Sequence, residues 1–343
     1  MKALIVSAAA VASAQIRLLA LSMARAVVVG ALAIASLLAI PALALEHIVF
    51  LLPAPPQLPA FAPMMIAKEQ GYYADAGYDV EFIAAKGGID VAKQVGVGNA
   101  PVGAALGDAP MIVKANGVPV KSVALLGGGA LGVIVARPGR GIDKIEDLRG
   151  KKVAVMSFQE ANYLALLGAL ATKGLSKNEV DIQAVGPGGV TSFVISGTVD
   201  ACVCTPDWEI DVRNAVPGTK SIPLAEVFPG MAQAILASDN TIATRPDLVR
   251  GVVKATLKGM RTVMDDPAAA AKIYTNALPA FAGKEELMTQ ILRNFAERTY
   301  NGQKVLGETD PDRLAKLQKF YIDVGFIPSA VPLEQLYTNE FVK

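Results

Sequence analysis

Few side chains in this sequence have the types and spacing that catalysis needs. His47 is the only histidine, so the sequence does not supply the base of a Ser–His or Cys–His pair. Cys202 and Cys204 are the only cysteines, and with one histidine they cannot complete the four soft ligands of a structural zinc site. Neither a GxxxxGK[ST] loop nor an HExxH motif is present. The sequence therefore predicts a protein that is not an enzyme and uses neither a metal nor a cofactor.

Polar, aromatic and glycine residues gather instead in loops that follow predicted strands. Glycines ahead of a helix leave backbone N–H groups free for an anion or a carbonyl oxygen. A lone tryptophan just past a strand can stack on a flat ligand. Fourteen residues in these loops or in the helix turn next to them form the predicted ligand-binding site: Gln57, Phe61, Lys86, Gly87, Gly88, Asp108, Ser157, Gln159, Asn162, Gly188, Gly189, Thr191, Asp207 and Trp208.

Structural roles are the alternative for several of these residues. Asp108 and the polar residues of 157–162 could cap helices, and residues 186–189 could form an ordinary turn. Trp208, the only tryptophan, could belong to the core. The carboxylates of Asp108, Glu160 and Asp207 would also repel a bare anion unless they are paired or turned away.

The same order of elements occurs twice along the chain. Strands are predicted at 47–52, 78–85 and 100–106, with helices at 62–70 and 89–98. Strands at 151–156, 179–185 and 199–204, with helices at 163–174 and 190–197, repeat this order. Such alternation predicts parallel sheets covered by helices. Because ligands bind beyond the carboxyl ends of parallel strands, the loops should meet in a cleft between two lobes.

The chain is predicted to cross between the lobes twice. Residues 45–137 and 231–343 are assigned to lobe I, and residues 138–230 to lobe II. Two crossings form a hinge that permits closure around a ligand. The motif GGGALG at 127–132 matches the dinucleotide pattern, but it precedes a predicted strand instead of the helix that would hold a pyrophosphate. We therefore expect close backbone approach near the hinge. The predicted fold class is α/β, with a mostly parallel sheet in each lobe.

Residues 1–44 differ in composition from the rest. They contain three basic and no acidic residues, followed by an apolar run at 26–44 that ends in Ala42-Leu43-Ala44. This pattern predicts a secretory signal peptide cleaved near Ala44, with translation starting at Met1 or Met23. A membrane anchor is the alternative, which Pro41 and the Ala-x-Ala ending disfavour. The whole chain has 32 basic and 31 acidic residues, without the basic surplus that nucleic-acid binding requires.

Five segments resemble the NMT1/THI5-like substrate-binding proteins, which serve ABC importers of the nitrate, sulfonate and taurine type. These segments are 64–82, 118–126, 142–155, 197–208 and 245–260. The resemblance implies the two-lobed periplasmic-binding-protein fold. It also implies a periplasmic monomer that delivers a small organic solute, a sulfonate or carboxylate being favoured, to an ABC permease in the inner membrane. One departure is Thr205-Pro206-Asp207-Trp208, where relatives often carry Trp-Glu-Pro.

Two alternatives follow from the same resemblance. The solute could be a thiamine-type pyrimidine precursor, whose amino groups would suit the carboxylates near the cleft. The chain could also be an enzyme of the pyrimidine-synthase type. That branch relies on histidine and a cysteine-rich segment, and this chain has one histidine and two cysteines. The sequence therefore favours a binding protein.

Overall fold

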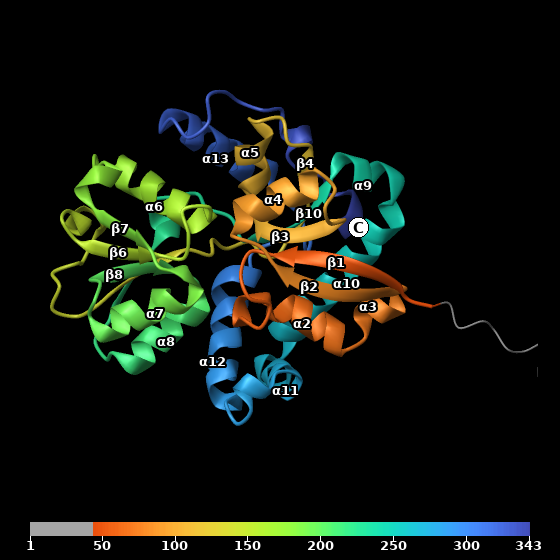
Figure 1. Cartoon of the computed structure of the whole chain (residues 1–343), viewed down its shortest axis with the longest axis horizontal. Helices are drawn as coiled ribbons and strands as arrows, with labels where there is room; N and C mark the ends of the chain where they lie inside the picture. Colours follow the sequence, from red (N-terminus) through yellow and green to blue (C-terminus); the bar gives the residue numbers. More distant parts are fainter. Residues whose placement is uncertain (1–43) are drawn as a thin grey trace, which may run out of the picture. The chain divides into compact units, whose positions relative to one another are not determined.

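Two five-stranded sheets, each between layers of helices, organise residues 44–343, which are the residues that the computed structural model describes (Figure 1). The predicted signal peptide lies outside the described residues, apart from Ala44. In each sheet one strand runs against the other four. Within the described part of the chain, no helix is both long enough and apolar enough to cross a membrane.

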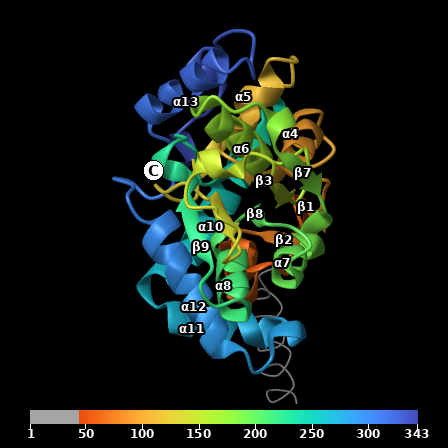
Figure 2. The ribbon, with the colours of Figure 1, turned by 90° about the vertical axis from the view of Figure 1, so that its left-hand side faces the viewer.

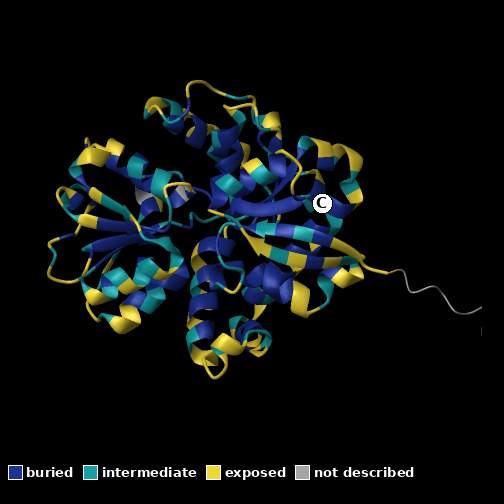
Figure 3. Cartoon of the chain, in the orientation of Figure 1, coloured by how far each residue is buried: buried dark blue, intermediate teal, exposed yellow. Residues whose placement is uncertain are grey.

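The first sheet, with its helices, is called lobe I. Its strands, in spatial order, are β2 (Tyr78–Ala84), β1 (Glu46–Leu52), β3 (Val102–Leu106), β10 (Gln233–Ser238) and β4 (Val120–Leu125). The central strands β3 and β10 are almost fully buried, because helices cover both faces (Figure 3). One face carries α2 (Ala62–Glu69), α3 (Tyr72–Asp75) and α10 (Pro246–Asp265). The other carries α4 (Gly88–Gly96) and α5 (Ala109–Lys114).

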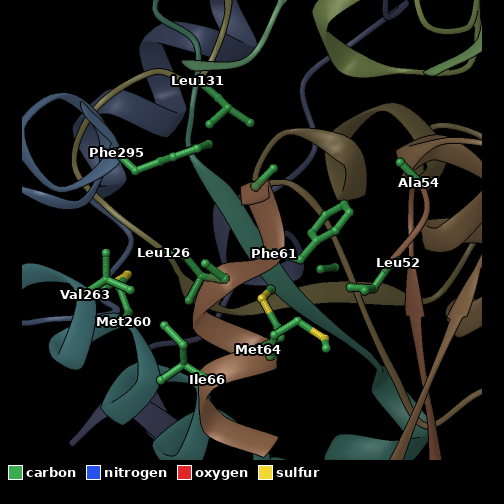
Figure 4. Close-up of a cluster of buried hydrophobic side chains, with 14 of the residues drawn as sticks. Leu52, Ala54, Phe61, Met64, Ile66, Leu126, Leu131, Met260, Val263 and Phe295 are labelled. Carbon is green, nitrogen blue, oxygen red and sulfur yellow. The ribbon is translucent and has the colours of Figure 1, made fainter. Parts of the chain in front are cut away.

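Two helices from distant parts of the sequence build the larger core of lobe I. Met64 and Ile66 of α2 pack with Met260 and Val263 of α10, as Figure 4 shows. All four side chains are fully buried. The apolar spacing along 246–265 fits this single buried stripe. The short helix α9 (Asp239–Thr244) connects β10 to α10.

The second sheet, with its helices, is called lobe II. Its strands, in spatial order, are β7 (Asp181–Ala184), β6 (Lys152–Val155), β8 (Ala201–Cys204), β5 (Val133–Ala136) and β9 (Lys220–Pro223). One face is covered by α6 (Ala161–Thr172) and the other by α7 (Gly186–Ser196) and α8 (Pro206–Ala215). Cys202 and Cys204 are free, buried thiols on β8, as their positions in an apolar strand predict.

The strand at 133–136 lies in lobe II, whereas a boundary at residue 137 would place it in lobe I. β5 pairs antiparallel with both β8 and β9. The first crossing between the sheets therefore precedes Val133 and includes the glycine motif at 127–132. The chain returns after β9 and enters the first sheet at β10, which pairs antiparallel with β3 and β4.

The triple glycine at 127–129 allows close backbone approach at the crossing. Gly128 N donates to Asn301 O at 3.0 Å, and Gly129 N donates to Thr299 O at 2.9 Å. A Cβ atom on Gly129 would lie 1.9 Å from the carbonyl oxygen of Arg298, so no side chain fits. The glycine motif is thus explained by packing at the hinge.

The C-terminal helices were predicted to belong to lobe I, but not all of them are confined to it. They are α11 (Pro267–Ala277), α12 (Glu285–Phe295) with the π-helical turn Ala296–Tyr300, and α13 (Pro311–Asp323). In Figures 1 and 2, α12 lies beside α8 of lobe II. Arg298 pairs with the buried carboxylate of Glu209 at 2.5 Å. The guanidinium group of Arg313 donates to the carbonyls of Gly128 and Gly230, one on each crossing.

Candidate functional site

A cavity lies where the strand ends of the two sheets face each other. It encloses about 520 Å³ of space free of protein atoms, including solvent at its mouth. Its walls come from both lobes and are mainly apolar, which is typical of small-molecule sites. The lining residues are Pro53, Ala54, Leu58, Ala60, Phe61, Gly88, Ala105, Leu106, Leu131, Met156, Glu160, Asn162, Thr205, Trp208 and Gln233.

Phe61 and Trp208 supply the aromatic walls from opposite lobes. Phe61 ends the 3₁₀ turn Pro59–Phe61, which the proline-rich loop after β1 leads into. Trp208 lies in the first turn of α8, directly after β8. Both rings are more than nine-tenths buried, so a ligand contacts them only inside the cavity.

Glu160 is an ionisable group in the cavity wall and is 7% exposed. One carboxyl oxygen, Oε1, accepts a hydrogen bond from Met156 N at 2.8 Å. Burial raises the pKa of Glu160 to about 8, despite the backbone hydrogen bonds that lower it. At neutral pH the group is therefore mostly protonated, and it can donate a hydrogen bond to a ligand.

The other polar groups in the wall are neutral. Asn162, Thr205 and Gln233 line the cavity, and among the described residues around it there is no lysine or arginine. Asn162 Oδ1 is buried and has no hydrogen-bond partner within residues 44–343. A buried amide oxygen without a partner costs free energy, so it favours a ligand that carries a donor.

The structure brings four of the fourteen predicted residues to this cavity: Phe61, Gly88, Asn162 and Trp208. Lys86 and Ser157 line an adjoining pocket with about 460 Å³ of space free of protein atoms, open solvent included. The structure therefore places six of the predicted residues at these two connected regions.

Gly87 and Gln159 lie where the two lobes touch at the mouth. Ile89 N of α4 donates to Gln159 O at 3.1 Å across the cleft. Gly87 has a φ of +112°, and a Cβ atom there would lie 3.0 Å from the same oxygen. Gln159 thus accepts a hydrogen bond between the lobes, and the missing side chain of Gly87 leaves room for this close approach.

Replacing Gly87 by Ala should weaken ligand binding about tenfold, because the side chain strains the backbone and crowds Gln159 O in the closed form. Titration calorimetry would measure the loss. Gly98→Ala is the matched control, because Gly98 has a φ of +85° but no atom within 4 Å of a Cβ position. Equal affinities for the two variants would contradict a closing role for Gly87.

The remaining predicted residues lie elsewhere. The side chain of Gln57 is exposed, and its carbonyl accepts from Tyr274 Oη at 2.6 Å. Asp207 is buried beside the cavity wall, where the Thr205 hydroxyl donates to it, and burial raises its pKa to about 6. The glycines 188 and 189 and Thr191 fall within the first turns of α7, which begins at Gly186, so residues 186–189 are helical instead of a preceding turn.

Asp108 is a structural residue in this arrangement. It is 1% exposed, and the Tyr321 hydroxyl of α13 donates to its Oδ2. Burial raises the pKa of Asp108, with the hydrogen bond from Tyr321 acting in the opposite direction. The hydrogen bond between Tyr321 and Asp108 therefore links α13 to the end of β3, and neither residue lines the cavity.

Tyr321→Phe should lower the free energy of unfolding by about 1–3 kcal/mol, because the buried Asp108 loses its donor. Chemical denaturation would measure this loss, with Tyr337→Phe as a control at a half-buried tyrosine. Ligand affinity should not change. Reduced ligand affinity with unchanged stability would instead indicate that Asp108 contributes to ligand binding.

Glu160, Thr205, Met156, Leu131 and Gln233 line the cavity but were absent from the predicted set. Glu160 was visible as part of the polar loop before α6, and Met156 and Thr205 directly follow β6 and β8. Leu131 precedes β5 and Gln233 begins β10. Both strands are antiparallel to their neighbours, so a prediction that looks only at the carboxyl ends of strands misses these two residues.

The two sheets, the double crossing and the cavity between them define the periplasmic-binding-protein fold. The fold matches the alkanesulfonate-binding protein SsuA from Xanthomonas axonopodis pv. citri bound to MOPS, with a TM-score of 0.66 at 15% identity, covering 86% of this chain and 98% of that one. It also matches the periplasmic nitrate-binding protein NrtA from Synechocystis PCC 6803, with a TM-score of 0.63 at 14% identity and 87% coverage of each chain.

The chain belongs to the NMT1/THI5-like family, whose model matches residues 58–270. It is 26% identical over 288 residues to the riboflavin-binding protein RibY of Chloroflexus aurantiacus, covering 82% of each chain. It is also 26% identical over 254 residues to the 4-amino-5-hydroxymethyl-2-methylpyrimidine phosphate synthase THI13 of Saccharomyces cerevisiae, covering 68% of this chain and 72% of the relative.

Proposed function

We propose that this protein is the periplasmic substrate-binding protein of an ABC importer and that it captures a flat, uncharged nitrogen heterocycle. After export and cleavage near Ala44, it would act as a monomer and deliver the solute to a permease in the inner membrane. The chemistry of the cavity wall carries the proposal: two aromatic rings, neutral amides and a protonated carboxylic acid, with no cationic side chain among the described residues that line it.

A sulfonate or carboxylate is less well supported, although the sequence favoured one. A bare oxyanion in a mainly apolar cavity needs a cation or several N–H donors, and Glu160 opposes its charge. A heterocycle can instead lie between Phe61 and Trp208 and exchange hydrogen bonds with Glu160 and Asn162. The names of the relatives, a riboflavin-binding protein and a pyrimidine phosphate synthase, support the same class of ring.

Pyrimidine phosphate synthesis is the second candidate function, because several relatives carry that name. The position of the histidine argues against it. His47 lies on β1 between Asp79 and Glu81, at 3.3 Å and 3.2 Å, and these side chains are exposed and outside the cavity lining. A histidine there cannot act on a ligand held in the cavity.

A thermal-unfolding screen tests the proposal. The panel contains riboflavin, hydroxymethylpyrimidines, alkanesulfonates, aromatic carboxylates and nitrate. A ligand at one hundred times its Kd adds about 2.7 kcal/mol to the free energy of unfolding. We expect this stabilisation from a heterocycle, which should be recovered chemically unchanged. Stabilisation by a sulfonate or nitrate alone would overturn the ligand class, and conversion of the pyrimidine would favour the synthase.

A further inference from the structure

The cavity between Phe61 and Trp208 continues into a second compartment at the mouth of the cleft. Both regions share Pro53, Ala54 and Met156 as lining residues, so the two spaces adjoin. The outer compartment also draws on both lobes. Its further lining residues are Pro55, Ala85, Lys86, Ser157 and Pro187.

The two compartments differ in chemistry. Within residues 44–343 no lysine or arginine lines the inner one, whereas the outer one is lined by Lys86, an exposed residue that forms no ion pair with these residues. Ser157 Oγ accepts from Gln159 N at 3.0 Å, which leaves the hydroxyl proton available to a ligand. The inner compartment suits a flat apolar ring, and the outer one suits oxygen atoms that accept hydrogen bonds.

One nearby carboxylate does not cancel this preference. Asp90 lies in the first turn of α4 and accepts from the backbone N–H of Lys86 at 3.0 Å and from the Gln94 amide at 3.4 Å. Its oxygens are thus engaged by the protein. Among the residues that line the outer compartment there is no Asp or Glu.

We propose that the solute has two parts: a flat heterocycle in the inner compartment and a polar tail with acceptor oxygens that reaches Lys86 and Ser157. The tail leaves the ring along Pro53, Ala54 and Met156, the residues common to both spaces. This inference rests on the proposed function, because it assumes that the ring occupies the space between Phe61 and Trp208. It adds that the tail contributes affinity through the side chain of Lys86.

Titration of the purified protein with graded probes tests the tail independently of the ring. One series is lumichrome, riboflavin and flavin mononucleotide: a bare ring, a hydroxylated tail and a phosphorylated tail. The other is hydroxymethylpyrimidine and its phosphate. Lys86→Met is the test variant, and Lys93→Met is the matched control, because Lys93 is exposed on α4, the helix that follows Lys86, and lines neither compartment.

In the series that binds, we expect the tailed probes to bind at least tenfold more tightly than the bare ring. Lys86→Met should weaken the phosphorylated probe by three- to tenfold and leave the bare ring unchanged, while Lys93→Met changes nothing. Equal affinities for bare and tailed rings, or equal losses for all probes in Lys86→Met, would overturn the two-part solute and leave the proposed function intact. Failure of both series to bind would overturn the proposed function itself.

Discussion

Replacing Trp208 by Ala should weaken binding of the solute by about 2–3 kcal/mol, or roughly 30- to 150-fold. Trp208 forms one wall of the cavity, opposite the loop that carries Phe61. Because the protein already buries most of the indole, the apolar surface that leaves contact with water when a flat ring covers it belongs mainly to the ligand and amounts to about 100 Å². At about 25 cal/mol per Å² this burial gives about 2.5 kcal/mol.

The sequence provides its own reporter for this measurement. Trp208 is the only tryptophan, so the change in tryptophan fluorescence on ligand addition comes from the cavity wall itself. Calorimetry would compare the wild type with Trp208→Ala and with Trp208→Phe, which keeps a flat apolar face and should lose less than tenfold. Unfolding experiments would verify that Trp208→Ala remains folded. A folded Trp208→Ala protein with wild-type affinity would place the ligand elsewhere.

Trp208 also illustrates which parts of the site could be predicted from the sequence. Strand and helix patterns are local, and the repeated alternation correctly indicated two sheets with loops at their carboxyl ends. Phe61, Gly88, Asn162 and Trp208 lie in these loops' 3₁₀ turn or in the first turns of the helices that follow them, and all four line the cavity. Their positions follow from one rule of parallel sheets, which needs no knowledge of long-range pairing.

The cavity residues that were missed and the strand that was misplaced depend on strand direction, which the local sequence does not show. Leu131 and Gln233 precede or begin strands that run against their neighbours, so their amino ends reach the ligand edge. Gln233 pairs with Leu106 at the end of β3, and Val133 pairs with Cys204 at the end of β8. The same reversal explains why residues 133–136 were assigned to the wrong lobe. An apolar strand does not show which sheet it joins.

The role of Asp108 depended on a partner far away in the sequence. The residue follows β3 at the expected sheet edge, but Tyr321, 213 residues later, accounts for its burial and its hydrogen bond. A loop carboxylate that binds a ligand and one that anchors a helix have the same local sequence. Only the packing of α13 distinguishes the two.

The second large effect that we expect is a dependence of affinity on pH that originates at Glu160. The backbone N–H of Met156 holds Oε1, so the proton is available on the other oxygen for an acceptor on the ligand. A bound acceptor stabilises the protonated form and raises its pKa further. Affinity should therefore be constant below pH of about 8 and fall by up to tenfold per pH unit above it.

Titration of Glu160 should also make the stability of the ligand-free protein depend on pH. The pKa of Glu160 is about 8 in the folded state and near 4.5 in the unfolded state. Between these values the folded state binds one more proton, so the free energy of unfolding falls as pH rises, by about 1.4 kcal/mol per unit from this group. Asp207 has a raised pKa of about 6, so below pH 6 it also makes the free energy of unfolding fall as pH rises.

Glu160→Gln separates these contributions, because the amide keeps the shape and a donor but does not titrate. The variant should bind within a few-fold of the wild type at pH 7, with an affinity that no longer changes between pH 7 and 9.5. It should also lose the stability slope between pH 6 and 8 and retain the part due to Asp207. The ligand used for these measurements must have no group that ionises between pH 7 and 9.5. If wild-type affinity rises with pH toward 8, Glu160 accepts from the ligand as a carboxylate, and the solute presents a donor or a cation at that position instead of an acceptor.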